Sequence, residues 1–214
     1  MRLGRAAMMS GGVPSRPGTP FGGGYYVGRM LGLDGFRYAL IVAPKSGGET
    51  TGPIQLLTNA NDVPGARSGW DGASNTAAFA AVTIGTSPAA IALASLNGSN
   101  FNGFNDWHIP ARYQLEMCYR NLKPSVDQNI TKDGTTSNQY ADPPTPAYTA
   151  TDPAQTTVAA FQKGGPEAFE DGDYWSSTSF APNMAWYQYM AYSAMTYELT
   201  TRSRRIRVVR MIRI

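Results

Sequence analysis

Glycine and proline divide this chain into short segments, and this limits its possible folds more than any other feature. The 214 residues include 23 glycines and 15 prolines, and only 15% of them are charged. Helical bundles and coiled coils need long runs of charged and helix-forming residues, so the sequence excludes both classes. Hydrophobic residues make up 42% of the chain, which is enough for a buried core. We therefore expect an α+β fold that is rich in loops and built from short elements.

Residues 1–24 are expected to form an extended Gly/Pro-rich arm ahead of a single domain at residues 25–214. Prolines between residues 13 and 20 and the glycine run at 22–24 disfavour a helix or a central strand. An arm of this kind is either disordered or docked on a partner. No stretch contains the ~18 apolar residues of a membrane span. The apolar run at 6–9 is too short for the core of a signal peptide, so we expect no standard export signal.

Local patterns predict the first half of the domain. Strand-like runs at 25–30 and 36–42 flank Asp34-Gly35, a pair typical of a β-hairpin turn. Cys118 falls on the apolar face of a predicted helix, which makes it a core residue rather than a nucleophile. Ser87 is the expected N-cap of another helix. The predicted helices lie at 74–82, 88–96 and 110–122.

The second half of the domain begins with a polar insertion at 124–173, in which only 158–161 is expected to form a helical turn. The pattern is that of β-strands from residue 174 onward. Six arginines fall within the last 13 residues, but residues 205–208 alternate arginine with β-branched apolar residues. This alternation favours a half-buried edge strand over a nucleic-acid-binding arm. Its slip at 208–209 indicates a β-bulge.

Seven aromatic residues lie within the 23 residues from Trp175 to Tyr197, interleaved with small polar residues and methionines. Tyrosine, tryptophan and serine together are typical of antibody binding surfaces. A strand would place Tyr187 on one face and Trp186 on the other, and so many hydroxyl and amide groups cannot all be buried with partners. Part of the segment must form a β-core, and we expect several of its tyrosines to be exposed for binding.

Few residues suit catalysis or metal binding. A single histidine, His108, and a single cysteine make a His-based metal cage and an intrachain disulfide impossible. The acidic residues within 167–173 could serve the hydrolysis of a polysaccharide or bind calcium weakly. Acidic residues clustered in a loop are more often solvated charges. We therefore expect no catalysis, no metal and no cofactor.

Four motifs of this chain, taken together, resemble a known family. They are Gly103–Pro110 followed by a helix, Tyr174–Thr178, Ala185-Trp186 and Arg205–Arg210. In order and rough spacing they resemble the Lcl C-terminal-like domain family, whose members are C-type-lectin-fold modules of bacterial surface proteins and phage tail-fibre proteins. Three further segments resemble the phage branch of this family, at 24–28, 38–44 and 71–76. The likeness covers about residues 21–214.

The resemblance implies a C-type-lectin-like fold, with short helices and twisted antiparallel sheets, that presents a variable C-terminal surface. Related modules include tropism determinants and other targets of diversity-generating retroelements. Their ligand surface lies between the Trp-Ser-Ser-Thr segment and the last strand. On this chain the implied receptor-binding residues are Phe180, Pro182, Asn183, Met184, Tyr187, Tyr189, Met190, Tyr192 and Tyr197. The implied scaffold residues are Trp175, Ser176, Ser177 and Trp186.

The chain departs from the patterns of this fold in several places. Ala111 and Gln114 stand where the family has a Ser or Thr cap and an acidic residue, which predicts a weaker helix N-terminus. Ala181-Pro182-Asn183 lacks the carboxylate of the corresponding triplet in calcium-dependent lectins. The formylglycine-generating branch needs paired reactive cysteines. We therefore expect neither calcium-dependent sugar binding nor that enzyme activity.

The expected function is that of a phage tail-fibre tip or adhesin that binds a bacterial surface protein or glycan without catalysis. Such a protein is made in the host cytoplasm and carried on the virion tail. Residues 1–24 are expected to attach it to a fibre shaft or baseplate protein, and the resemblance implies a homotrimer. The alternatives are a structural tail or baseplate component, a surface-polysaccharide hydrolase and a bacterial surface lectin. Exposure of residues 180–197 favours the receptor-binding role over the structural one.

Overall fold

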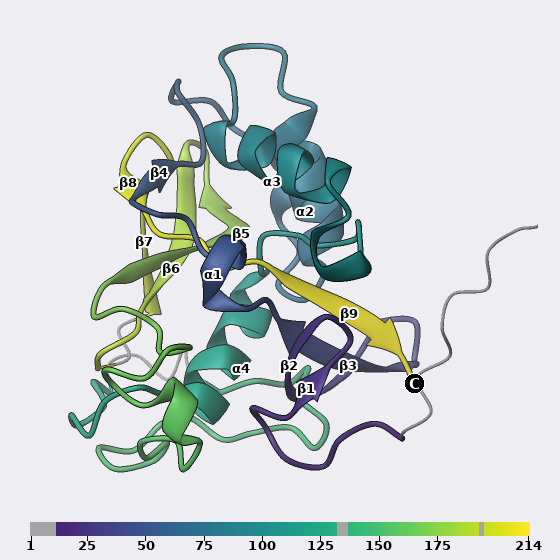
Figure 1. Cartoon of the computed structure of the whole chain (residues 1–214). Coiled ribbons are helices and arrows are strands. Elements are labelled where there is room, and N and C mark those ends of the chain that lie inside the picture. Colours follow the sequence, from purple (N-terminus) through teal and green to yellow (C-terminus); the bar gives the residue numbers. More distant parts are fainter. Residues whose placement is uncertain (1–11, 132–136, 193–194) are drawn as a thin grey trace, which may run out of the picture.

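A computed structural model of the chain describes residues 12–131, 137–192 and 195–214 (Figure 1). The structure combines a few short helices with small, curled antiparallel sheets, in agreement with the α+β prediction. Within these residues, no helix has the length and apolar character needed to cross a membrane. The C-type-lectin topology itself stays a prediction.

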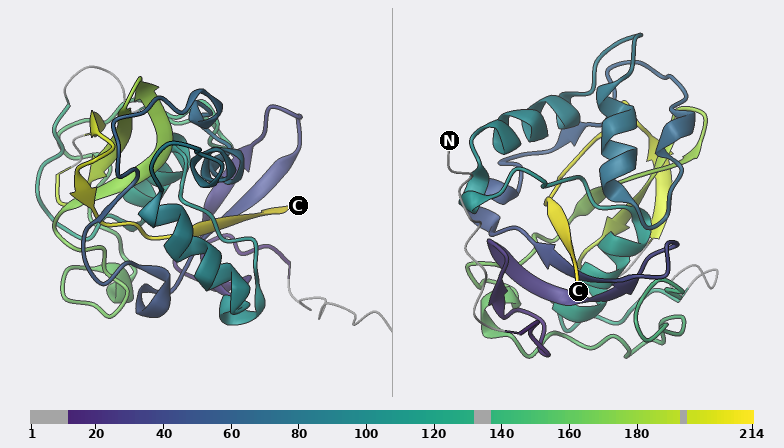
Figure 2. Two further views of the ribbon diagram at one scale, coloured as in Figure 1. Left: turned by 90° about the horizontal axis from the view of Figure 1, so that it is seen from above. Right: turned by 90° about the vertical axis from the view of Figure 1, so that its right-hand side faces the viewer.

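The largest sheet has four strands in the order β1-β2-β3-β9. Its strands are β1 (Pro20–Phe21), β2 (Gly24–Leu31), β3 (Arg37–Val42) and β9 (Val209–Arg213). The predicted β2–β3 hairpin is confirmed, and Gly35 has a φ of 79° in its turn, a conformation that glycine adopts without strain. Figure 2 (left) shows this hairpin projecting from the body beside the end of β9.

The N-terminal segment is not separate from the domain where the structure describes it. Residues 18–26 form a tight hairpin, in which the Gly18 amide donates to the Tyr26 carbonyl and the Tyr26 amide to the Thr19 carbonyl. Arg210 donates to the carbonyl of Gly22 at 2.8 Å. Residues 20–24 of the predicted arm thus pair in the largest sheet, with Pro20 opposite Tyr25 and Phe21 opposite Gly24. Residues 1–11 of the predicted arm lie outside the described residues.

The three predicted helices are present. Their bounds are α2 (Gly72–Ala80), α3 (Pro88–Gly98) and α4 (Arg112–Leu122). Asp71 caps α2 and Ser87 caps α3, each through its side-chain oxygen. The other helical pieces are single turns or nearly so: α1 (Lys45–Gly48), η1 (Pro64–Ala66), η2 (Phe101–Gly103) and η4 (Ala159–Phe161). The last of these confirms the helical turn predicted inside the insertion.

The N-terminus of α4 is stabilised by two side chains, contrary to the weakness predicted from Ala111 and Gln114. The Gln114 side chain accepts the Ala111 amide at 2.8 Å. Thr178, far along the chain, accepts the Arg112 amide at 2.9 Å. Local sequence patterns cannot predict the second contact, because it joins α4 to a strand of another sheet.

The C-terminal part of the chain is β-rich, as predicted. It contributes β5 (Asp173–Ala181), β6 (Met184–Tyr189), β7 (Met195–Leu199) and β8 (Ser203–Arg204). A three-stranded sheet has the order β5-β6-β7, and β8 pairs with β4 (Ile54–Gln55). Residues 205–208, which lie between β8 and β9 in the sequence, form only isolated bridges: Arg205 with Tyr174 and Arg207 with Glu49. The predicted arginine strand is therefore interrupted before Val209.

Two apolar clusters form the core, one on each side of the largest sheet. One contains α4, part of the insertion, Cys118 and Met190. The other contains residues of α2 and α3 together with Trp107 and Trp175. Cys118 is buried, as predicted, and burial raises the pKa of its thiol to about 12. The thiol is therefore neutral and inaccessible.

The insertion is held to the body by a buried lysine at the end of α4. Lys123 is 2% exposed, and its ammonium donates to Asn129 Oδ1 at 2.9 Å and to the Pro153 carbonyl at 3.3 Å. It also donates to the carbonyl of Asp127. These oxygen acceptors satisfy the three N–H groups of one ammonium, so a side chain of the protein itself organises this loop region.

Candidate functional site

The Trp-Ser-Ser-Thr segment of β5 lies in the interior. Trp175, Ser176 and Ser177 are fully buried. Ser177 donates its hydroxyl to the Ile109 carbonyl at 2.9 Å, and its amide donates to the Pro110 carbonyl. The pairing of β5 with β6 is irregular between Trp175 and Ser179 because of these contacts. The segment thus joins the small sheet to the start of α4.

One face of the β5-β6-β7 sheet carries a row of three aromatic side chains, one from each strand. Phe180 and Tyr197 stack with ring centroids 3.7 Å apart and planes at 11°. Trp186 meets both of them edge-on, at 5.1 and 5.6 Å. Phe180 and Tyr197 are 40% and 43% exposed, whereas Trp186 is half-buried. We call these three residues the aromatic row.

Arg112 extends the aromatic row beyond the sheet. Its guanidinium lies 3.8 Å from the ring centroid of Trp186 and 5.0 Å from that of Tyr113. Tyr113 in turn packs on Tyr140 at 5.1 Å. The sequence did not point to Arg112 or Tyr113, because they belong to α4 and meet the row only in the folded chain. Trp186, which the resemblance assigned to the scaffold, belongs to the exposed row.

The other predicted site residues fall into separate groups. Tyr187 lies on the opposite face of β6, between Trp175 and the guanidinium of Arg204, which is 3.7 Å from its ring centroid. Tyr189, the last residue of β6, stacks on Tyr192 with ring centroids 4.1 Å apart. Three of the residues implied for the receptor-binding surface, Tyr187, Tyr189 and Tyr192, therefore lie in two separate places.

Met190 is wrong as a surface residue, because it is fully buried in the core cluster around α4. A continuous strand is also wrong for Tyr189 and Tyr192, because it would place them on opposite faces, whereas their rings stack. Both errors have one cause: β6 ends at Tyr189, and the chain turns directly afterwards. Of the tight turn between β5 and β6, Pro182 is exposed, and Asn183 and Met184 are half-buried. Asn183 adopts a φ of 57°.

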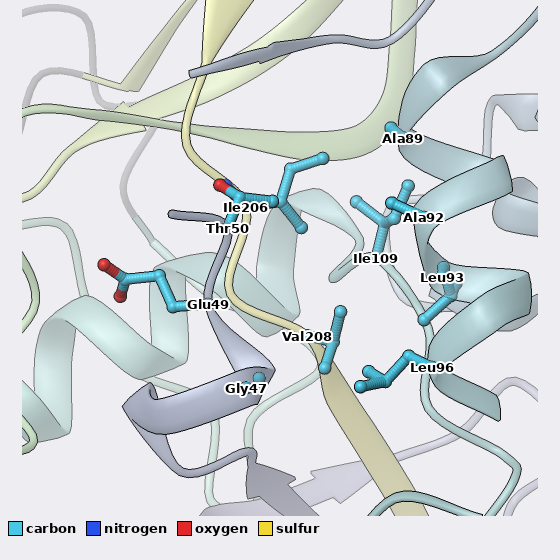
Figure 3. Close-up of a pocket in the computed structure, with 11 residues that line it drawn as sticks. Gly47, Glu49, Thr50, Ala89, Ala92, Leu93, Leu96, Ile109, Ile206 and Val208 are labelled. Carbon is cyan, nitrogen blue, oxygen red and sulfur yellow. The ribbon is translucent and has the colours of Figure 1, made fainter. Parts of the chain in front are cut away.

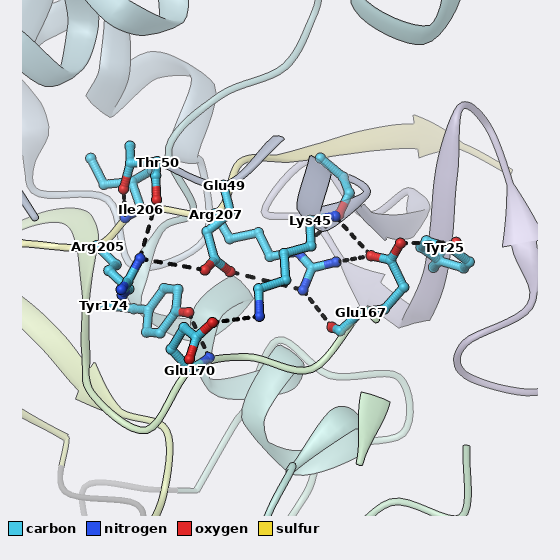
Figure 4. A network of polar contacts seen from close by, with 11 residues as sticks. Tyr25, Lys45, Glu49, Thr50, Glu167, Glu170, Tyr174, Arg205, Ile206 and Arg207 are labelled. Carbon is cyan, nitrogen blue, oxygen red and sulfur yellow. Dashed lines mark hydrogen bonds and ion pairs between the residues drawn. The ribbon is translucent and has the colours of Figure 1, made fainter. Parts of the chain in front are cut away.

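Two of the six C-terminal arginines, Arg207 and Arg210, are buried, whereas Arg202 and Arg213 are exposed. Figure 4 shows Arg207 at the centre of a polar network below Thr50 and Ile206. Its side chain is fully buried and donates to the Glu167 carboxylate at 2.5 Å and to the Ala43 carbonyl at 2.9 Å. Glu49 lies 3.9 Å away. Burial raises the pKa of the Glu49 carboxyl, although Arg207 acts in the opposite direction.

Other arginines of this segment also pair with acidic side chains. Arg210 forms a two-pronged pair with Asp106, with Nε–Oδ1 and Nη2–Oδ2 distances of 2.7 and 2.8 Å. Arg204 pairs with Asp173 at 3.1 Å. These contacts agree with the predicted half-buried strand and give the arginines a structural role.

The acidic side chains of the loop at 167–173 pair with four different basic residues. Glu167 binds Arg207 and Asp173 binds Arg204. Glu170 pairs with Lys45, and Asp171 with Lys163. Each carboxylate thus has its own cation. Among the residues placed by the structure, His, Cys, Asp and Glu side chains nowhere gather in threes as metal ligands.

A small apolar cavity lies between α3 and the segments 47–50 and 206–208 (Figure 3). Its volume is about 140 Å³, and Leu93, Leu96 and Ile109 are among the aliphatic side chains that line it. The carboxylate of Glu49 points away from this lining in Figure 3. Ligand sites for drug-sized molecules are usually ≈ 300–1,000 Å³ and carry convergent polar groups. This cavity has neither property.

The family model described as the Lcl C-terminal domain matches residues 67–210. The chain belongs to the Lcl C-terminal domain family. The matched region of this Lcl domain includes α2, α3, α4 and the whole β5-β6-β7 sheet, and so contains the aromatic row. Neither a search of curated proteins nor a search of solved structures found a match. Family membership fits a surface- or tail-associated protein.

Proposed function

We propose that this Lcl domain is the receptor-binding part of a phage tail-fibre tip or adhesin, and that the aromatic row forms the centre of its binding surface. One observation carries the proposal: Phe180 and Tyr197 remain about two-fifths exposed while stacked on each other. Large exposed apolar groups in a rigid arrangement are typical of interaction surfaces. Binding by such a surface requires no catalysis and no cofactor.

The arrangement of the two ends of the molecule supports this proposal. Figure 1 shows the β5-β6-β7 sheet on the left and the β2–β3 turn with the end of β9 on the right. The right-hand end carries a second group of exposed apolar side chains, Leu31, Leu33 and Phe36. Val13 and Ile214 line one shallow pocket there. A tip protein needs an attachment end opposite its receptor-binding end.

We therefore assign attachment to the right-hand end. Val13, Pro14 and Ser15 lie beside Arg37 and Ile214 at this end, and we propose that the N-terminal arm attaches the protein to a fibre shaft or baseplate protein. A homotrimer on the virion tail, made in the host cytoplasm, is the assembly that we propose. Size-exclusion chromatography with light scattering, on the full chain, tests the trimer directly.

The binding surface is tested with the variants Phe180→Ala and Tyr197→Ala. A central aromatic hot spot costs about 2 kcal/mol or more when truncated, roughly thirtyfold in affinity. The matched control is Ile91→Ala, which removes a 58% exposed apolar side chain from α3. Binding to host cells and melting temperature are measured for each variant.

We expect both aromatic variants to bind host cells at least about tenfold more weakly at nearly unchanged melting temperature, and the control to bind normally. Normal binding by both aromatic variants would contradict the proposal. In that case a structural tail or baseplate component, the alternative considered above, becomes the better description of this chain.

A further inference from the structure

We propose that the outer edge of β7 receives an extended segment of a host protein as an additional β-strand, with side chains of that segment packed on the aromatic row. The inference rests on the proposed receptor-binding function and names the chemical class of the receptor. It therefore decides between the bacterial surface protein and the glycan that the sequence left open.

The pairing of β6 with β7 determines which backbone groups point outward. Asn183 accepts the Thr200 amide at 2.9 Å, so these two residues form a hydrogen-bonded pair just beyond the strand ends. Such pairs alternate with non-hydrogen-bonded pairs along an antiparallel ladder. Trp186 and Tyr197 are therefore a non-hydrogen-bonded pair. The N–H and C=O groups of Tyr197 point away from β6.

This outer edge is available for pairing. In the part of the chain that the structure describes, β6 is the one strand beside β7, and no backbone group bonds to those of Tyr197. The edge ends at Leu199, whose amide donates to the Glu198 carboxylate and whose carbonyl accepts the Arg202 amide. The outward N–H and C=O groups of Tyr197 therefore remain available to pair with a further strand. Only another polypeptide in extended form offers the alternating donors and acceptors that match them.

The aromatic row adjoins this edge through the same residue. Side chains approach each other closely in a non-hydrogen-bonded pair, so Tyr197 packs against Trp186 and carries Phe180 on its face. A strand added beside β7 places every second side chain on this face of the sheet. Apolar side chains at those positions gain contact with the row, while backbone bonds hold the segment in register.

The polar side chains near the row favour a protein over a glycan. Arg112 is stacked on Trp186, and Glu198 accepts from the backbone of the next residue. Gln188, two residues along β6 from Trp186, is fully buried. A sugar ring brings several hydroxyl groups that must exchange water for polar partners. Gln188 is buried and so cannot meet a sugar hydroxyl, and one Glu198 oxygen is already engaged by a backbone amide.

The receptor class is tested on three preparations of host cells: untreated, shaved with a protease and oxidised with periodate. The full-length protein is used, with binding measured by flow cytometry. We expect binding to untreated and periodate-oxidised cells to be equal, and binding to protease-shaved cells to be lost. Loss on periodate treatment, or binding that survives protease, would overturn the proposal.

The backbone contact is tested by comparing Tyr197→Pro with Tyr197→Ala. Both variants lack the ring, but only proline also removes the outward N–H, a change that edge strands tolerate. We expect the proline variant to bind at least about tenfold more weakly than the alanine variant at a similar melting temperature. Thr196→Pro is the matched control. It removes an inward N–H that pairs with Tyr187, so it should unfold the sheet.

A photo-cross-linking experiment decides the matter should Tyr197→Pro lower the melting temperature. A benzophenone amino acid replaces Tyr197, and irradiation on host cells is expected to give a covalent adduct with a protein. Adducts with no protein component would reject the strand-addition model. The two proposals fail separately: normal binding by Phe180→Ala and Tyr197→Ala rejects the proposed function, whereas their loss of binding together with periodate sensitivity rejects strand addition alone.

Discussion

Arg207 shows how much of this structure depends on single charged side chains placed in the interior. Its guanidinium donates to the carbonyl of Ala43, which follows β3, and to the carboxylate of Glu167 in the insertion. One residue of the segment that precedes β9 thus connects both of these regions. Removing one member of a buried ion pair leaves an uncompensated charge and is strongly destabilising. Conserving the volume of the side chain does not prevent this cost.

Arg207→Met is therefore expected to lower the free energy of unfolding by roughly 3–5 kcal/mol, because the largely buried Glu167 carboxylate loses its cation and Glu49 keeps only Arg205, at 3.9 Å. Urea denaturation measures the loss. Arg37→Ala is the matched control, since it breaks an exposed ion pair with Asp142 and should cost at most about 1 kcal/mol. Equal effects of the two variants would show that the buried network does not stabilise the fold.

The carboxyl of Glu49 gives a pH-dependent prediction. Burial raises its pKa, so its protonated form is favoured in the folded state, and this contribution to stability is lost as the pH rises through the raised pKa. Glu49→Gln mimics the neutral form at every pH. We expect the variant to gain stability relative to the wild type between about pH 4 and about pH 7. A difference in melting temperature that stays constant over this range would contradict the prediction.

Sequence patterns predicted the environment of some single residues but not of others. Cys118 was predictable as a core residue because helical periodicity is a local signal. Phe180 and Tyr197 came from the family resemblance, and the structure brings them together. Arg112 escaped notice because its contact with Trp186 depends on how α4 meets the small sheet. Met190 also came from the resemblance, and it is buried because the chain turns into the core directly after β6 ends at Tyr189.

At the scale of elements, local sequence signals predicted a hairpin turn and a helix cap correctly. Contacts between segments far apart in the sequence were not predicted. The turn residues of the β2–β3 hairpin and the cap Ser87 lie within a few residues of the elements that they define. The pairing of β3 with β9 and the cap that Thr178 provides to α4 join distant segments. No pattern within either segment encodes its partner. The same reason explains why β1 was assigned to an arm rather than to the sheet.

Truncation separates the arm from the sheet. A chain that begins at residue 12 should fold with an unchanged melting temperature, because all described contacts are retained. A chain that begins at residue 25 loses β1 and the contact of Arg210 with Gly22, and we expect a clear drop in melting temperature. Differential scanning fluorimetry compares the two. If both chains melted alike, β1 would contribute nothing to the stability of the sheet.

At the scale of the whole molecule, the long insertion is fastened by protein side chains rather than left to an external ligand. Lys123 supplies the cation at the centre of its oxygen acceptors, and Arg207 binds the loop that carries Glu167. These two contacts secure both ends of a region that contains little regular structure. We expect a loop organised in this way to keep its shape without a metal.

We therefore expect melting curves with and without a chelator to coincide, and metal analysis of the purified protein to find no stoichiometric ion. The Lys123→Met variant is the informative comparison, because it leaves the oxygen acceptors without a cation and should melt at a lower temperature. A large fall in the melting temperature of the wild type on chelation would contradict the prediction.

The position of β9 also bears on synthesis of the chain. β3 finds its partner in residues 209–213, and the guanidinium of Arg207 meets a carbonyl 164 residues earlier in the sequence. Ribosomes add ≈ 5–20 residues per second, so the first hairpin waits many seconds with an open edge and an uncovered apolar face. We expect the nascent chain to depend on chaperones during that interval. Any product released before β9 is translated lacks the strand that closes the sheet, and proteases rather than assembly are its expected fate.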